Sequence, residues 1–188
     1  MPGGPFWIVV GVVVGIPLLW FVVTLNRFVR LKTLIRESWA NVDVALKRRY
    51  DLIPNLVETV KGYAAHERET LQRVVEARNR AVASTGPVGQ QAEDENQLVR
   101  SVNQLLARVE AYPQLRASEN FLALQRELVN TEDRIAAARR FYNANVREYN
   151  VLGQQFPSML VGGIAGFAHA DFFEVDDIAI RVAPRVQI

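Results

Sequence analysis

An unbroken apolar stretch near the N-terminus is the first feature of the hydrophobic pattern. Residues 6–25, FWIVVGVVVGIPLLWFVVTL, carry no charged side chain, and neither does any other residue up to position 26. A helix of this length spans about 30 Å, which matches the hydrocarbon core of a bilayer. The pattern therefore predicts a single transmembrane helix.

Small and aromatic residues within this stretch indicate how the anchor is built. Gly11 and Gly15 form a G-x-x-x-G pair, which lets two helices approach closely, and Pro17 is expected to bend the helix. Tryptophan favours the interfaces of a bilayer, although Trp20 lies deep in the stretch. The residues expected to define the anchor are Phe6, Trp7, Gly11, Gly15, Pro17, Trp20 and Leu25.

A cleavable signal peptide is the alternative to an anchor. Such a peptide usually has a positively charged start, a shorter apolar core and small residues at its cleavage site. Here Met-Pro-Gly-Gly-Pro precedes the apolar stretch, and Leu25-Asn26-Arg27-Phe28 is a poor cleavage site. We therefore expect the anchor to be retained.

Positive charges follow the apolar stretch directly. They are Arg27, Arg30, Lys32 and Arg36, and only the α-amino group is charged before it. By the positive-inside rule, this asymmetry predicts that the N-terminus lies outside the cell and the rest of the chain in the cytoplasm. The same basic residues could bind anionic lipid headgroups.

Residues 36–69 carry a helical seam with one charged member. Seam positions recur at alternating steps of three and four, which lines one face of a helix that packs on other helices. The seam consists of Trp39, Val42, Leu46, Arg49, Ile53, Leu56, Val60 and Tyr63. A buried guanidinium is costly unless it is paired. Arg49 therefore either extends its head into water along an apolar stem, or pairs with an acid on a facing helix.

Pro54 interrupts this seam in the middle. An interior proline removes one hydrogen bond of the helix and clashes with the preceding turn, so we expect a kink or a break at residues 50–54. Asp51 could cap a restarted helix that holds Pro54 in its first turn.

Two more helices are predicted further along the chain. Residues 84–89, STGPVG, combine helix breakers with small polar residues and predict a loop. One helix is expected from about 91 to 112, where a Tyr-Pro pair ends it, and the last from about 115 to 152. The last helix has a coiled-coil-like seam from Phe121 to Leu152. Glu127 and Glu132 flank that seam and are the candidates to pair with Arg48 or Arg49.

Together these patterns predict an all-α protein, with a single N-terminal transmembrane helix followed by an antiparallel bundle with coiled-coil-like packing. If residues 36–83 fold back on themselves, the bundle has four helices and its C-terminal end returns to the bilayer. If that stretch is one straight helix, there are three, and the end points into the cytosol. We favour four. The expected parts are a short N-terminus and anchor over 1–26, the bundle over 27–152, and an apolar segment with an extended tail over 153–188.

The C-terminal region is rich in glycine and aromatic residues. Its apolar run SMLVGGIAGFA is too short to span a bilayer and too glycine-rich for a stable helix. Such a run must bury itself against the bundle, a partner or the membrane surface. The end of the last helix is polar and aromatic, either as a wet bundle end or as a partner face. The candidates for that face are Tyr142, Asn145, Tyr149, Phe156, Pro157, Gly166, Phe167, Phe172 and Phe173.

The run ALKRRYDLIPNLVETVKGYAAHERETLQRVVEARNRA resembles the signature of the LemA family, and it contains Arg48, Arg49, Asp51, Pro54 and Asn55. The later ENFLALQRELVNTEDRIAAARRFYNANVREYN and the FP…GF…FFE ending are similar to the family's second half. The resemblance implies a bacterial inner-membrane protein with one N-terminal anchor and a cytoplasmic antiparallel bundle. The family's biochemical activity is not established, and its members are often encoded near membrane metalloproteases.

Composition argues against several classes of protein. The formal net charge is only +2, which weakens the case for nucleic-acid binding. The chain has no cysteine, which fits a reducing compartment. His66-Glu67 begins like a zinc motif, but position 70 is threonine, so the second histidine is missing. We expect no catalytic residues, no metal site and no cofactor.

Two functional hypotheses follow, and a third, a hydrolase, is disfavoured because the catalytic motifs are missing. The first is a non-enzymatic membrane-anchored scaffold or adaptor that self-associates and contacts the bilayer. The second is a regulatory or sensor subunit of a membrane complex, such as a membrane metalloprotease system.

Overall fold

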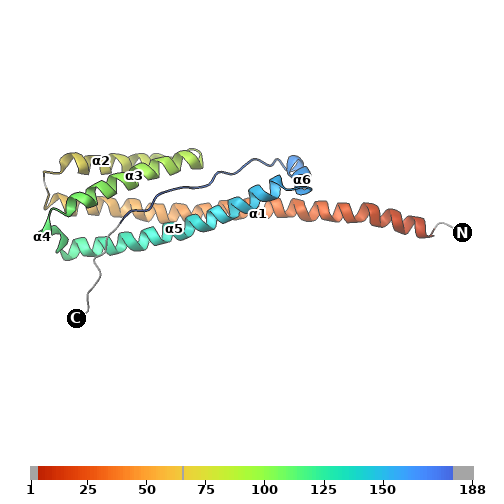
Figure 1. Cartoon of the computed structure of the whole chain (residues 1–188), viewed down its shortest axis with the longest axis horizontal. Coiled ribbons are helices and arrows are strands. Elements are labelled where there is room, and N and C mark those ends of the chain that lie inside the picture. The colour runs from red at the N-terminus through yellow and green to blue at the C-terminus, as the bar shows by residue number, and fades with distance from the viewer. Residues whose placement is uncertain (1–3, 65, 180–188) are drawn as a thin grey trace, which may run out of the picture. The chain divides into compact units, whose positions relative to one another are not determined.

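The computed structural model describes residues 4–64 and 66–179. Over these residues the chain forms helices and connecting segments without a strand (Figure 1). The helices are α1 (Gly4–Lys61), α2 (Arg68–Ala83), α3 (Val88–Val109), α4 (Pro113–Arg116), α5 (Glu119–Gln154) and α6 (Ser158–Ile164). The predicted all-α class and the long apolar N-terminal helix are confirmed.

The chain divides into two compact units. The first unit contains α1 up to Ser38, α5 from Asn143 and the segment through α6 to Ala170. The second unit contains the rest of α1, helices α2, α3 and α4, the start of α5 and the described tail from Asp171. Helices α1 and α5 therefore contribute to both units.

A kink or a break is expected at residues 50–54, and the break does not occur, because α1 continues to Lys61. Proline lacks an N–H, so the carbonyl oxygen of Tyr50, four residues earlier, loses its helical donor. The Nε of Arg78 on α2 supplies a replacement hydrogen bond to that oxygen, at 3.2 Å. Asp51 is accordingly an exposed residue inside the helix rather than a cap.

The chain reverses after α1 instead, at residues 62–67. The amide of Ala64 donates to the carbonyl of Val60 at 2.8 Å, which closes the last turn, and α2 then packs beside α3 (Figure 1). The predicted seam is buried from Val42 to Val60, whereas Tyr63 lies beyond the helix and is exposed.

The last two predicted helices begin earlier or divide. Helix α3 starts at Val88, directly after Pro87, and not at residue 91. The helix expected from 115 is two helices, because α4 ends at Arg116 and α5 begins at Glu119. The core of the second unit is formed by the apolar stripes of these helices, including Leu98, Leu105, Leu115, Phe121, Leu128 and Ile135, each with at most 1% of its surface exposed.

Helix α6 contradicts the expectation that its sequence is too glycine-rich to be helical. Its core contact is Val161, which packs with Phe28, Leu31, Tyr149 and Leu152. Glycine at 162 permits this packing, since a Cβ there would lie 3.2 Å from Cζ of Phe28. Tertiary packing thus outweighs the low helix propensity of glycine.

Candidate functional site: a buried arginine cluster and the pocket beside it

Arg49 lies in the interior of the second unit with none of its surface exposed. Its Nη2 and Nε donate to the two carboxylate oxygens of Glu132 on α5, at 2.6 and 2.8 Å. Its Nη1 donates to Oε2 of Glu95 on α3, at 2.7 Å. The alternative in which Arg49 extends into water is therefore wrong, and the guanidinium joins three helices.

The neighbouring arginine behaves differently. Arg48 reaches Glu127 with an Nη2–Oε2 distance of 2.7 Å, but both side chains are almost half exposed. Such a surface pair contributes little to stability. Both acids that flank the α5 seam thus lie opposite an arginine of α1, one pair inside the unit and the other on its surface.

Glu95 is a member of the cluster that was not predicted from the sequence, although its position carried a signal. Glu95 falls on the buried stripe of α3, three residues before Leu98, and has 1% of its surface exposed. An acid at a seam position is the same anomaly that Arg49 presents on α1, and two such anomalies on facing helices predict a pair. Besides Arg49, Glu95 accepts a hydrogen bond from the hydroxyl of Tyr50.

Burial sets the electrostatics of this cluster. Removal from water raises the pKa of the Glu95 carboxyl, against the opposing attraction of Arg49. Burial and then the charge of Glu95 raise the pKa of the Tyr50 hydroxyl, so that it stays a protonated donor. Removal from water opposes the charge on Arg49, but the carboxylates of Glu132 and Glu95 prevail and raise its pKa.

The polar atoms of the cluster are all paired with one another or with the chain around them. Throughout the described residues, every buried side-chain nitrogen or oxygen has a hydrogen-bond partner. A buried network whose members are all paired rigidifies the core around it. The described residues also contain no group of three or more acids and histidines placed to hold a metal ion.

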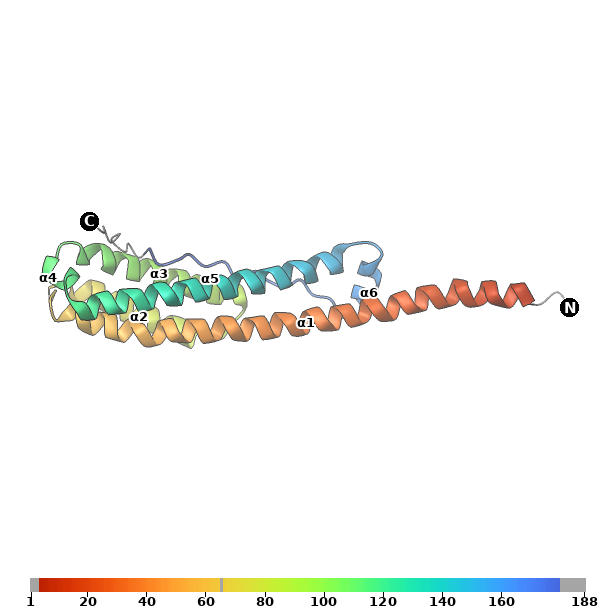
Figure 2. The same cartoon turned by 90° about the horizontal axis from the view of Figure 1, so that it is seen from below.

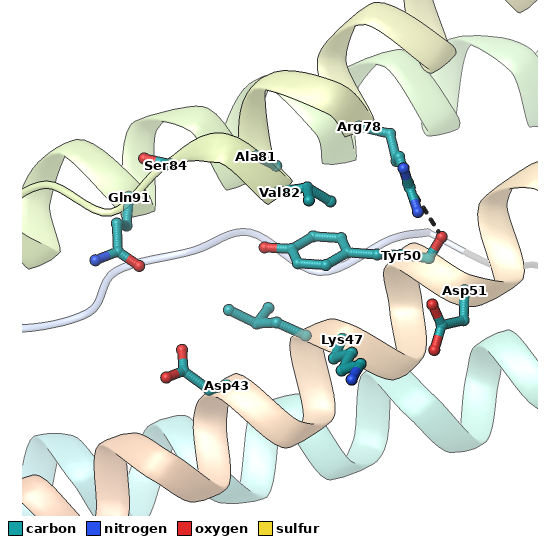
Figure 3. Close-up of a pocket in the computed structure, with 10 residues that line it drawn as sticks. Asp43, Lys47, Tyr50, Asp51, Arg78, Ala81, Val82, Ser84 and Gln91 are labelled. Atoms are coloured by element: carbon teal, nitrogen blue, oxygen red, sulfur yellow. Dashed lines mark hydrogen bonds between the residues drawn. The ribbon is translucent and has the colours of Figure 1, made fainter.

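A pocket of about 330 Å³ lies beside the cluster, between α1 and α2 (Figure 3). The ring of Tyr50 lies in its middle, with Val82 of α2 on one side and Lys47 of α1 on the other (Figure 3). Because the Tyr50 hydroxyl bonds Glu95, one side chain joins the pocket to the cluster. The lining residues are Asp43, Leu46, Lys47, Tyr50, Asp51, Arg78, Ala81, Val82, Ser84 and Gln91.

The tail from Asp171 to Ala179 lies along the second unit. Asn96 and Asn103, seven residues apart on α3, accept hydrogen bonds from the amides of Asp176 and Ala179, both at 2.8 Å. The amide of Ile178 donates to Oε2 of Glu132 at 3.4 Å. The tail, for which the sequence favours disorder, is instead attached to the helices as far as it is described, and residues 180–188 lie outside the described part.

Much of the predicted partner face is occupied by the chain itself. In the second unit, Tyr142 packs against Trp39 and donates to the carbonyl of Asp171 at 3.0 Å, and Phe173 is fully buried. Phe172 is half-buried. These side chains hold the tail in place, so they are not an open surface.

The remaining candidates for that face belong to the first unit. Asn145 donates to the carbonyl of Leu34 at 3.5 Å, and the ring of Tyr149 packs between Phe28 and Phe167. Phe156 and Pro157 are exposed. Gly166 is also exposed and has a φ of 67°, a conformation that glycine adopts without strain.

The anchor residues lie in α1, which runs through Pro17 without interruption. In the described part of the chain, α1 alone is long and apolar enough to cross a membrane, as judged by length and composition. Its side chains from Val10 to Val14 are exposed, Trp20 is 38% exposed, and a Cβ at Gly11 or Gly15 would meet no atom. Phe6 and Trp7 belong to the same helix, and Leu25 is half-buried. All four basic residues after the apolar stretch are exposed: Arg27, Arg30, Lys32 and Arg36.

The remaining signature residues are surface residues of α1. Pro54 and Asn55 are both exposed, and the carbonyl of Asn55 accepts a hydrogen bond from the hydroxyl of Thr59 at 2.8 Å. Neither residue lines the pocket, whereas Asp51 does.

Comparison with known proteins supports the resemblance seen in the sequence. Magnetosome protein MamQ 2 of Paramagnetospirillum magneticum is 26% identical over 79% of this chain and 64% of that protein. Magnetosome protein MamQ of Magnetospirillum gryphiswaldense is 26% identical over 92% of this chain and 74% of its own length. Protein LemA of Metamycoplasma hominis is 29% identical over 66% of this chain and 57% of its own length. The chain thus spans less than two thirds of the first of these relatives.

The LemA family model matches residues 38–188, from the start of the buried seam on α1 through the tail. The exposed apolar helix in front of that region and the relatives indicate a membrane-associated helical protein. Because the match covers most of the chain, the protein belongs to the LemA family.

Proposed function

We propose that this protein is a non-enzymatic, membrane-anchored scaffold that self-associates in the bacterial inner membrane. The observation that carries the proposal is the character of α1. One helix presents exposed apolar side chains from Val10 to Trp20 and, further along, buries Arg49 among two carboxylates. The first feature suits lipid, and the second suits a fixed helical assembly.

The chemistry of the cluster supports a structural role. Arg49, Glu95 and Glu132 satisfy one another inside the second unit, and such a network aligns helices. We infer that α2, α3, α1 from Trp39 and α5 up to Tyr142 form an antiparallel four-helix bundle with coiled-coil-like packing. Nothing in this role calls for a cofactor or for nucleic acid.

The basic residues after the span support a cytoplasmic location for the bundle. Arg27 and Arg30 are exposed and lie within two turns of the span, as the positive-inside rule requires. A single cysteine introduced as Arg100→Cys tests this in a chain without native cysteine. We expect no reaction with an impermeant maleimide in intact cells and full reaction after lysis. Reaction in intact cells would reverse the topology.

Self-association is tested on the full chain in mild detergent. Light scattering coupled to gel filtration should give an oligomer whose mass falls in the double variant Gly11→Ile with Gly15→Ile, because the larger side chains keep two spans apart. The matched control, Val10→Ile with Val14→Ile, should leave the mass unchanged. A wild-type monomer would contradict the scaffold, and a monomer bound to a membrane protease would favour the regulatory-subunit hypothesis instead.

A further inference from the structure

Helix α6 has one buried face and one exposed apolar face. Ser158, Val161 and Gly162 are buried against the first unit. The opposite face presents Met159, Leu160 and Ile164 with 49%, 60% and 75% of their surface exposed, and Phe156 beside it is 79% exposed. No charged residue occurs from 156 to 164. An apolar surface of this kind on a short helix requires a cover.

The place of α6 along α1 indicates what that cover is. Phe21 and Leu25, in the last turns of the apolar stretch, pack against the same cluster as Val161 of α6. Gly162 lies against Phe28, only three residues beyond the stretch. Both views of the first unit show α6 beside α1 (Figures 1 and 2). From Val10 to Val14, by contrast, the side chains of α1 are uncovered.

This geometry sets the depth of α6. A helix rises 1.5 Å per residue, so Phe28 is about 5 Å beyond Leu25 along the axis. The headgroup layer on each side of a bilayer is about 5–7 Å thick, since a core of about 30 Å lies within a total of about 40–45 Å. If residues 6–25 cross the hydrocarbon core, α6 lies in the headgroup layer.

Several contacts fix the direction in which the exposed face points. The hydroxyl of Ser158 donates to the carbonyl of Leu152 at 2.6 Å, and the amide of Phe167 donates to the carbonyl of Gly162 at 2.9 Å. The ring of Phe167 also fills the space above Gly153, where a Cβ would lie 2.1 Å from it. The exposed face is therefore held in place before it meets a surface.

We propose that α6 and Phe156 form a second membrane contact, whose apolar face inserts between the headgroups and acyl chains of the bilayer that α1 crosses. This inference rests on the proposed membrane anchor. A neutral apolar face suits the boundary of the acyl chains, and the exposed Arg27, Arg30 and Lys32 suit the headgroups of anionic lipid at the same level. The contact resembles that of an amphipathic helix lying in the interface, tied to a spanning helix.

The test uses the full chain in vesicles of phosphatidylethanolamine and phosphatidylglycerol. Single-cysteine variants Leu160→Cys and Ile164→Cys carry an environment-sensitive fluorophore, with Met159→Cys in reserve should either fail to fold. Val14→Cys, 61% exposed within the span, is the positive control. Val44→Cys is the matched negative control, because it is 71% exposed on α1 and 19 positions beyond residue 25. Lipids with a nitroxide near the headgroup serve as the quencher for positions 160 and 164, and lipids with a nitroxide deep in the acyl chain serve as the quencher for position 14.

Quenching by the lipid nitroxide at positions 160 and 164, with a blue-shifted emission relative to position 44, is the expected result. Quenching at position 14 but not at 160 and 164 would overturn the inference while the anchor stands. If iodide in the buffer then reaches positions 160 and 164, the face is open to water. If neither quencher reaches them, a protein surface covers the face, and either outcome overturns the membrane contact. Absence of quenching at position 14 would instead overturn the anchor itself.

Discussion

Arg49 and Glu132 meet inside the second unit although 83 positions separate them in the chain. Both oxygens of the carboxylate accept from the guanidinium, at 2.6 and 2.8 Å, and neither residue has more than 7% of its surface exposed. Glu95 binds the third side of the same guanidinium. Two buried carboxylates thus share one guanidinium, and this shortage of positive charge determines how substitutions change the stability.

Replacing Arg49 by methionine should destabilise the protein by about 3–5 kcal/mol, because two buried carboxylates lose their shared partner. Arg48→Met is the matched control, since Arg48 makes a similar bond on the surface, and should cost less than about 1 kcal/mol. Urea unfolding in mild detergent, followed by circular dichroism, measures both. Equal costs for the two variants would mean that burial adds nothing to the Arg49 pairing.

The stability contributed by Glu95 should depend on pH. Burial raises the pKa of its carboxyl above the ordinary 4.5, so the folded protein holds the proton more tightly than the unfolded chain does. This contribution is complete below pH 4.5 and is lost as the pH rises through the folded-state pKa. In urea titrations at a series of pH values, the wild type should lose stability relative to Glu95→Gln as the pH rises through this range. If the wild type instead gained stability relative to Glu95→Gln as the pH rises, Arg49 would be keeping Glu95 ionised.

Pro54 and Arg78 should be energetically coupled. In the wild type, Arg78→Met removes the donor that satisfies the carbonyl of Tyr50, which should cost about 1 kcal/mol. In a Pro54→Ala background, the new amide of residue 54 can donate to that carbonyl within the helix, so the same substitution should cost less. A double-mutant cycle on unfolding free energies should therefore give a coupling of about 0.5–1 kcal/mol. Additive effects would show that the Arg78 bond does not compensate for the proline.

Gly153 should not tolerate even one added carbon. A Cβ at this position would lie 2.1 Å from the ring of Phe167, so Gly153→Ala should cost about 1–3 kcal/mol through displacement of that ring. Gly163→Ala is the matched control, because no atom lies within 4 Å of its Cβ position and α6 gains a better helix former. Thermal unfolding of the two variants in detergent compares them. A neutral Gly153→Ala would show that Phe167 moves freely.

Periodicity predicts elements better than it predicts their interruptions. The steps of three and four from Val42 to Val60 indicated the buried face of α1, because burial on a helix follows its period. The same pattern could not reveal that Arg78, 24 positions beyond Pro54, supplies the missing donor and keeps the helix intact. A proline within a helical pattern therefore need not break the helix, since another side chain can satisfy the freed carbonyl.

Tertiary partners also decided the rest of the site. Glu132 could be named from its position beside the α5 seam, whereas Glu95 required knowing that α3 and α5 face α1 together. The glycines of α6 disfavour a helix by propensity alone, and the sequence does not show that the ring of Phe28 packs beside Gly162. The tail required Asn96 and Asn103, whose amides carry no hydrophobic signal.

Oε2 of Glu132 accepts two hydrogen bonds, one from Nη2 of Arg49 and one from the amide of Ile178. Truncation of the tail, or its displacement by a competing peptide, would expose the Glu132 carboxylate to water on the side where Ile178 now binds it. The tail therefore shields the ion pair from solvent, and its removal would weaken the attraction between Glu132 and Arg49.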